Sequence, residues 1–159
     1  MGGVMSTVNC LLKGTVHDLL SKGKYEAIRE LISKVNSREE IREIINLERA
    51  IIEREKKQCT GVGEGVAIAH GKTEYAGPPL VFLGISRKGI DYDAPDGKPV
   101  NLLFIITNHP AYQQEYIGVL SAIARLAGNE DFRRSLLSLK HTAEIENVLI
   151  QKLSHLYCL

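Results

Sequence analysis

The sequence predicts an α/β fold, a single domain in which a central mixed β-sheet is flanked by helices on both faces. Residues 80–85 and 100–106 form two nearly uninterrupted apolar runs of strand length. Neither run alternates with polar residues, as a strand with one face in water would, so both strands are expected to be buried on two faces. Amphipathic helical segments precede and follow these runs, and they supply the two outer layers.

Composition places the chain among ordinary globular proteins. It has 159 residues, of which 44% are apolar and 25% charged, and its net charge is +1. A charge so close to zero argues against nucleic acid or an acidic membrane surface as the partner. No apolar run reaches the roughly 18 residues of a membrane helix, so no membrane insertion is expected. The three cysteines lack the spacing of a metal site, which favours a reducing, cytoplasmic location.

Apolar periodicity and turn signals set the order of the elements. Residues 1–14 are interpreted as an N-terminal extension to a domain at 15–157. Ser37 and Glu40 have the spacing of a capping box and mark the start of a long helix. The turn-rich residues 87–99 are expected to leave the sheet. In order, the expected elements are a strand at 15–20, helices at 25–35 and 38–57, strands at 66–69, 80–85 and 100–106, a brief edge pairing at 90–92, and helices at 113–127, 130–139 and 142–156.

The stretch at residues 59–72 is the most informative about function. Its alternate glycines predict a bendable loop, and the apolar run that follows predicts a short buried strand. The glycine spacing fits neither a dinucleotide-binding fingerprint nor a Walker loop, because a strand follows where those motifs need a helix. The strand closes at His70, which Gly71 follows. One imidazole is therefore expected at a strand end, where α/β folds often place their sites.

From the residues alone, His70 has two interpretations. A lone histidine is a structural residue more often than a functional one, and no Ser-His-Asp arrangement is legible in the chain. The one plausible metal set, His70 with His109, Asp91 and Asp93, matches no metal-binding spacing. Neither a metal nor an organic cofactor is therefore expected.

Three motifs in a fixed order carry a family resemblance. They are Arg54-Glu55 at a helix end, Thr-Gly-Val-Gly-Glu-Gly at 60–65, and Val-Ala-Ile-Ala-His-Gly-Lys at 66–72. In this combination the chain resembles the enzyme IIA domain of the bacterial phosphotransferase system, of the fructose–mannitol and nitrogen-regulatory type (EIIA type 2). The resemblance extends over roughly residues 24–153, with further similarity at 83–85, 89–94 and 96–104.

The resemblance implies that His70 accepts a phosphoryl group from the phosphorylated histidine-containing phosphocarrier protein. The group would then pass to a cysteine of a sugar-specific IIB domain, or stay as a regulatory mark. The resemblance also places Arg54 near the site, where a guanidinium can hold phosphoryl oxygens in a fork. Further contacts are expected from the loop residues Thr60, Gly61, Gly63 and Glu64.

The chain departs from the family pattern at two positions. Ala69 stands where a proline usually precedes the histidine, and Tyr116 stands where many members carry a second histidine. Tyr116 can donate a hydrogen bond but cannot become positively charged as histidine does. His109 lies upstream of that position, before a proline, and is the other histidine considered as a replacement.

These features favour a phosphoryl carrier with a regulatory, nitrogen-type role, because the second histidine is missing and no fused IIB or IIC segment is expected. One alternative is a transport subunit that passes the phosphoryl group to a IIB domain for uptake of a fructose- or mannitol-type sugar. Another is a non-catalytic module that binds a regulatory target through the surface around His70. Whether the protein is an enzyme therefore stays open at this point.

Overall fold

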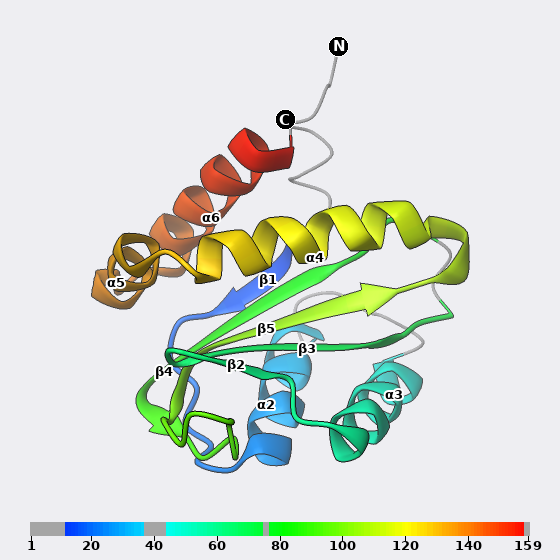
Figure 1. The fold of residues 1–159 in the computed structure, drawn as a ribbon, viewed down its shortest axis with the longest axis horizontal. Helices are drawn as coiled ribbons and strands as arrows, with labels where there is room; N and C mark the ends of the chain where they lie inside the picture. The colour runs from blue at the N-terminus through cyan, green and yellow to red at the C-terminus, as the bar shows by residue number, and fades with distance from the viewer. Residues whose placement is uncertain (1–11, 37–43, 75–76, 158–159) are drawn as a thin grey trace.

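A five-stranded mixed sheet lies at the centre of the fold (Figure 1). The computed structural model describes residues 12–36, 44–74 and 77–157. Across the sheet the strand order is β1-β4-β5-β3-β2. β1 runs parallel to β4 and β3 runs parallel to β5, whereas β4–β5 and β2–β3 are antiparallel pairs. The strands are β1 (Leu12–Val16), β2 (Gly61–Gly63), β3 (Val66–Lys72), β4 (Val81–Ile90) and β5 (Val100–Asn108).

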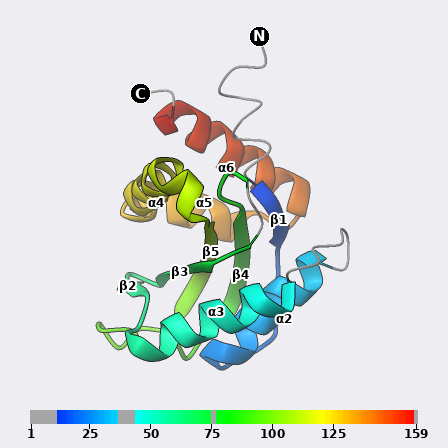
Figure 2. The same cartoon turned by 90° about the vertical axis from the view of Figure 1, so that its right-hand side faces the viewer.

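Helices cover both faces of the sheet, which confirms the predicted layers (Figure 2). Successive residues of a strand point to opposite faces. Ala67 and Ala69 of β3 accordingly pack with α2 and α3, while Val66 and Ile68 pack with the helices after β5. None of the described helices is long and apolar enough to cross a membrane. The helices are α2 (Lys24–Asn36), α3 (Ile44–Lys57), the short 3₁₀ turn η1 (Pro110–Tyr112), α4 (Gln113–Ala127), α5 (Glu130–Ser138) and α6 (Thr142–Tyr157).

Two of the predicted starts, those of α3 and β1, are not confirmed by the structure. The helix expected at 38–57 is described from Ile44 onwards and ends at Lys57 as expected, but its proposed capping box lies outside the described residues. The strand expected at 15–20 is wrong in its bounds, because β1 spans Leu12–Val16 and so crosses the predicted domain boundary between residues 14 and 15.

The glycine-rich stretch is partly a strand, which corrects the prediction of a loop. Gly61–Gly63 pairs antiparallel with the start of β3. Between the two strands, Glu64 has a φ of 56° and Gly65 a φ of 79°. Positive φ at both central residues is the signature of the type I′ turn, whose twist suits a two-residue hairpin. The glycine pattern therefore encodes a hairpin that leads into β3.

The β4 strand is longer than predicted. It continues through the expected turn at 87–89 and ends at Ile90. Gly89 adopts a φ of 93°, and its N–H donates to Ser86 Oγ at 3.0 Å, so the strand bends and shifts register there instead of turning back. Of the edge pairing expected at 90–92, Ile90 pairs with Val100, and Asp91 forms an isolated bridge with Gly23.

After β1 the chain keeps one more bond to the sheet, from the N–H of Leu19 to the carbonyl of Ile85 at 2.7 Å, and a carboxylate accepts the next two amides. The backbone N–H groups of Leu20 and Ser21 donate to the carboxylate of Glu30 at 2.8–3.0 Å, and Lys34 pairs with it at 2.6 Å. Partial burial alone would raise the pKa of Glu30, but these hydrogen bonds outweigh burial and lower the pKa to about 2.

Replacing Glu30 with glutamine is expected to lower the free energy of unfolding by about 1 kcal/mol near pH 7, after allowance for screening of a partly exposed group. The folded-state pKa of about 2 lies below the ordinary value of 4.5. The carboxylate therefore stabilises the fold above pH 4.5, and this contribution disappears as the pH falls toward 2. Urea unfolding of both proteins across this range measures the effect. If the difference in the free energy of unfolding between the two proteins does not narrow as the pH falls, the prediction is wrong. Glu26→Gln, on the same helix, is the control.

Candidate functional site

His70 lies near the end of β3, at a place where the strand has an open edge. β2 pairs only with the first residues of β3, and Thr60 extends the pairing by accepting the N–H of Ile68 at 3.1 Å. Past Ile68, no described strand pairs with this outer edge of β3. His70 shares a strand face with Ile68, which packs under α4, so its half-buried ring points toward that helix.

A pocket of about 400 Å³ surrounds the imidazole. It is formed by α3 from one side of the sheet, by the ends of β3 and β5, and by α4 from the other side. It brings together three residues that the sequence predicted, His70, Arg54 and Tyr116. Three cationic side chains and one carboxylate line it, which favours an anionic ligand. The lining residues are Ala50, Glu53, Arg54, Lys57, His70, Gly71, Lys72, Asn108 and Tyr116.

Gly71 allows α3 to approach the strand closely enough to contribute to this pocket. A Cβ at Gly71 would lie 2.7–3.0 Å from atoms of Ile51, including its backbone nitrogen. Only a residue without a side chain permits that contact. Arg54 lies three residues after Ile51, close to one helical turn further on, and is thereby carried to the edge beside His70.

The environment keeps the His70 ring neutral near pH 7. Burial is the main cause that lowers the pKa of His70 below its ordinary value of 6.5, and the Arg54 charge lowers it further, while the Glu55 charge opposes both. Among the described residues, neither ring nitrogen of His70 has a hydrogen-bond partner within the protein. A neutral imidazole has one nitrogen with a free electron pair, so His70 can act as a nucleophile.

Tyr116 occupies the place beside His70 that the sequence assigned to it. The two ring centroids are 6.2 Å apart and the ring planes are inclined by 56°. Burial raises the pKa of Tyr116, against a smaller opposing effect of the Arg54 charge, so the phenol stays protonated near pH 7. His109 does not take this place, because its Nδ1 accepts the N–H of Ala111 at the start of η1 and the ring lies outside the pocket.

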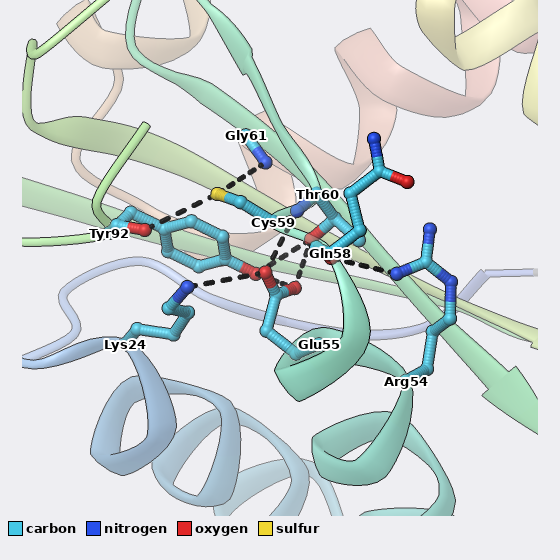
Figure 3. A network of polar contacts seen from close by, with 8 residues as sticks. All are labelled: Lys24, Arg54, Glu55, Gln58, Cys59, Thr60, Gly61 and Tyr92. Atoms are coloured by element: carbon cyan, nitrogen blue, oxygen red, sulfur yellow. Dashed lines mark hydrogen bonds and ion pairs between the residues drawn. The ribbon is translucent and has the colours of Figure 1, made fainter. Parts of the chain in front are cut away.

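One nitrogen of the Arg54 guanidinium is fixed by a hydrogen bond. Its Nη1 donates to the carbonyl oxygen of Gln58 at 2.7 Å (Figure 3). Gln58 follows the last residue of α3, where helix carbonyls lack intrahelical partners, and a basic side chain commonly binds them. Since Arg54 has no other hydrogen bond to a described residue, its remaining N–H donors are available at the pocket.

The four loop residues predicted to bind the ligand do not line the His70 pocket. The N–H and hydroxyl groups of Thr60 both donate to Glu55, and the N–H of Gly61 donates to Cys59 Sγ at 3.3 Å. Gly63 and Glu64 border a separate hollow near the end of α4. Binding by these residues stays a prediction, and the structure as described gives it no direct support.

Several residues at the site were not singled out from the sequence. Lys72 and Asn108 are register partners at the ends of two parallel strands, so the meeting of those strand ends was the signal that could have identified them. Lys57 follows Arg54 by three residues on α3, the spacing of helix neighbours. Glu55 belonged to the Arg54-Glu55 motif of the resemblance but was assigned no role, because it lies in a run of charges typical of an exposed helix face, yet it is only 2% exposed. Within the described part of the chain, no cluster of three metal-ligating side chains occurs.

Comparison with known proteins gives a consistent result. Residues 12–152 match the family model for the phosphoenolpyruvate-dependent sugar phosphotransferase system, EIIA 2. The chain is 39% identical over 102 residues to the fructose-specific EIIA component of Haloferax volcanii, which covers 64% of this chain and 66% of that protein. It is 31% identical over 147 residues to the fructose-specific EIIABC component of Bacillus subtilis, which covers 92% of this chain but 22% of that protein. The matches thus span less than two thirds of the length of these relatives.

Solved structures show the same fold. The nitrogen regulatory protein IIA-Ntr from Neisseria meningitidis aligns with a TM-score of 0.76 and 28% identity, over 90% of this chain and 99% of that one. Enzyme IIA for mannitol from Escherichia coli, in its complex with phosphorylated enzyme IIB, aligns with a TM-score of 0.68 over 90% and 95% of the two chains. Its identity is 17%, so this likeness shows the fold alone.

Proposed function

Because this chain belongs to the EIIA type 2 family of the phosphoenolpyruvate-dependent sugar phosphotransferase system, we propose that it carries a phosphoryl group on His70. The proposed donor is the phosphorylated histidine-containing phosphocarrier protein. The observation that supports this most is the basic pocket in which a neutral, half-buried imidazole lies beside Arg54 and Tyr116.

The transfer needs no cofactor. The ring nitrogen of His70 with the free electron pair, proposed to be Nε2, attacks the phosphorus carried by the donor's ring. The phosphorus–nitrogen bond to the donor breaks as the bond to His70 forms. The donor ring, protonated at its other nitrogen, leaves as a neutral imidazole with its electron pair restored, and the phosphorylated His70 ring then releases its own N–H proton to water. A neutral ring is required for the attack, and the lowered pKa of His70 supplies it near pH 7.

The pocket offers the charge that such a transfer requires. Phosphoryl transfer depends on positioning and on stabilising the charge of the equatorial oxygens more than on covalent help. The free guanidinium donors of Arg54 can hold two of these oxygens, and Lys57 and Lys72 add positive charge at the rim. Tyr116 contributes one neutral donor.

Incubation with the phosphorylated carrier protein tests the proposal. The protein should gain one adduct of about 80 Da that is lost in acid, as expected for a phosphohistidine. If no adduct forms under conditions that label another EIIA of this family, the proposal is wrong. That result would favour the second candidate, a binding module that docks through the surface around His70, and the observation in its favour is Tyr116 at the place of a second histidine.

The recipient of the phosphoryl group is the finer question. The replacement of a second histidine by Tyr116 and the fold similarity to a nitrogen regulatory protein support a regulatory role. The identity with a fructose-specific EIIA component supports transfer to a IIB domain during sugar uptake. Either role belongs in the cytoplasm. Loss of the adduct to a IIB cysteine would favour transport, and retention of the adduct would favour regulation.

A further inference from the structure

We infer that Glu55 is a positioning residue for the His70 site, and that it fixes Arg54 through the connector between α3 and β2. Glu55 follows Arg54 on α3, but Figure 3 shows its carboxylate turned toward Thr60 and Tyr92 while the guanidinium lies to one side, at the Gln58 carbonyl. The two neighbours thus face different surroundings, one buried and one in the pocket. This inference rests on the proposed function, since it concerns the geometry of transfer to His70.

Glu55 is the centre of a buried polar network. Its carboxylate accepts the backbone N–H of Thr60 at 2.8 Å, the Thr60 hydroxyl, and the hydroxyl of Tyr92 at 2.9 Å. The ammonium of Lys24 on α2 lies 3.4 Å away and supplies the opposite charge. A buried carboxylate is tolerated when its oxygens are bonded and its charge is paired, and both conditions are met here. Removing any one of these groups would leave the others unsatisfied.

The network fixes the segment on which Arg54 rests. Thr60 is tied to Glu55 by both of its donors, and Gln58, whose carbonyl accepts from Arg54, lies two residues earlier. Cys59, between them, is itself held, because its Sγ accepts the N–H of Gly61 and donates to the carbonyl of Tyr92 at 3.4 Å. The carbonyl that orients the guanidinium is therefore held in place by the Glu55 network.

Tyr92 keeps its proton around neutral pH. Burial is the main cause that raises the pKa of Tyr92, and the Glu55 charge raises it further, so the phenol keeps the proton that it donates. The Tyr92 and Thr60 hydroxyl oxygens lie 2.9 Å apart, so each hydroxyl also contacts the other. The hydrogen bond from Tyr92 to Glu55 therefore remains in place near pH 7, where His70 is neutral.

Glu55 also acts on His70 through its charge. The charged or titratable groups around the ring are Glu53, Arg54, Glu55 and Lys57 from α3, Lys72 from β3, and Tyr116 from α4. Of these, the Glu55 charge raises the pKa of His70 while the Arg54 charge lowers it. A substitution that removes only the Glu55 charge should therefore lower the pKa of His70 further. A loss of packing alone would not produce this change.

The test compares Glu55→Gln with Glu48→Gln. Glu48 lies on the same helix and pairs with Arg29 outside the pocket, so it controls for the change of charge. Glu55→Gln is expected to slow phosphoryl transfer about 10-fold at a saturating concentration of the phosphorylated carrier, because the Arg54 guanidinium is misplaced. The carrier concentration that gives half of the maximal rate should change less. NMR titration should show the pKa of His70 falling further below its wild-type value. Glu48→Gln should match the wild type in both measurements.

A second comparison separates positioning from stability. If Glu55 acts through Arg54, then adding Glu55→Gln to Arg54→Ala should slow transfer by less than about 3-fold further, because the two residues are coupled. Tyr92→Phe keeps the charge of Glu55 and removes the hydroxyl that contacts Glu55 and Thr60, so it should slow transfer a few-fold even if Glu55→Gln proves unable to fold.

The outcomes are distinguishable. Transfer at the wild-type rate in Glu55→Gln or in Tyr92→Phe overturns the inference, as does full additivity with Arg54→Ala. If the wild-type protein itself takes up no phosphoryl group, the proposed function fails. The inference is then judged by the NMR titration alone, and an unchanged pKa of His70 in Glu55→Gln overturns it.

Discussion

Replacement of His70 by glutamine is expected to abolish phosphoryl transfer, with a loss of more than about 1,000-fold, because the nitrogen that would bond to phosphorus is removed. The half-buried ring makes no hydrogen bond to a described residue, so the fold should tolerate the change. Mass measurement after incubation with the phosphorylated carrier detects the adduct, and its loss in acid identifies a phosphohistidine.

His109→Gln is the matched control for this substitution. His109 follows the end of β5, next to the strand of His70, but its ring accepts the N–H of Ala111 and does not reach the pocket. This variant should be labelled as the wild type is. Undiminished labelling of His70→Gln, or loss of labelling in His109→Gln, would show that His70 is not the residue that carries the phosphoryl group.

Replacement of Arg54 by alanine is expected to slow transfer to His70 about 100-fold, the usual effect of removing one donor aimed at developing charge. Its guanidinium is fixed by the Gln58 carbonyl, and its other donors are available at the pocket. Arg54→Lys should restore only part of the rate, because an ammonium keeps the charge but lacks the planar fork. Rapid-quench measurement of the first transfer gives both rates.

Two further observations check this prediction. The Arg54 charge lowers the pKa of His70, so Arg54→Ala should raise that pKa. Arg49→Ala removes an exposed arginine of the same helix that lies outside the pocket, and it should change neither the rate nor the pKa. An Arg54→Ala protein that transfers at the wild-type rate would show that the guanidinium plays no part in the reaction.

Much of the fold was predictable because burial on both faces leaves a clear pattern. β4 and β5 are nearly continuous in apolar residues, and that property alone requires two covering layers. The end of β4 was missed because Arg87, Lys88 and Gly89 look like a turn, whereas Gly89 only bends the strand. The bounds of β1 were missed because its residues, Leu-Lys-Gly-Thr-Val, include only two large apolar side chains and so show no apolar run.

The sequence predicted which residues meet at the site, but it did not predict the directions in which their side chains point. His70, Arg54 and Tyr116 come together as expected, since the motifs fix which elements meet. Sequence spacing does not say where a donor points, so Thr60 was expected at the pocket although both of its donors are bonded to Glu55. The same limitation hid the role of Glu55, which was recognised only as part of a motif, because its neighbours in the sequence are charged while its own carboxylate is buried.

The short length of β2 determines whether His70 is accessible. β2 ends after covering the first residues of β3, so the strand that carries the imidazole has a neighbour on one side only at that point. Two more residues of pairing would extend the hairpin alongside His70 and cover the strand edge that borders its pocket. The ring would then be an interior side chain, unreachable by another macromolecule. Accessibility at this position is thus set by where a neighbouring strand stops.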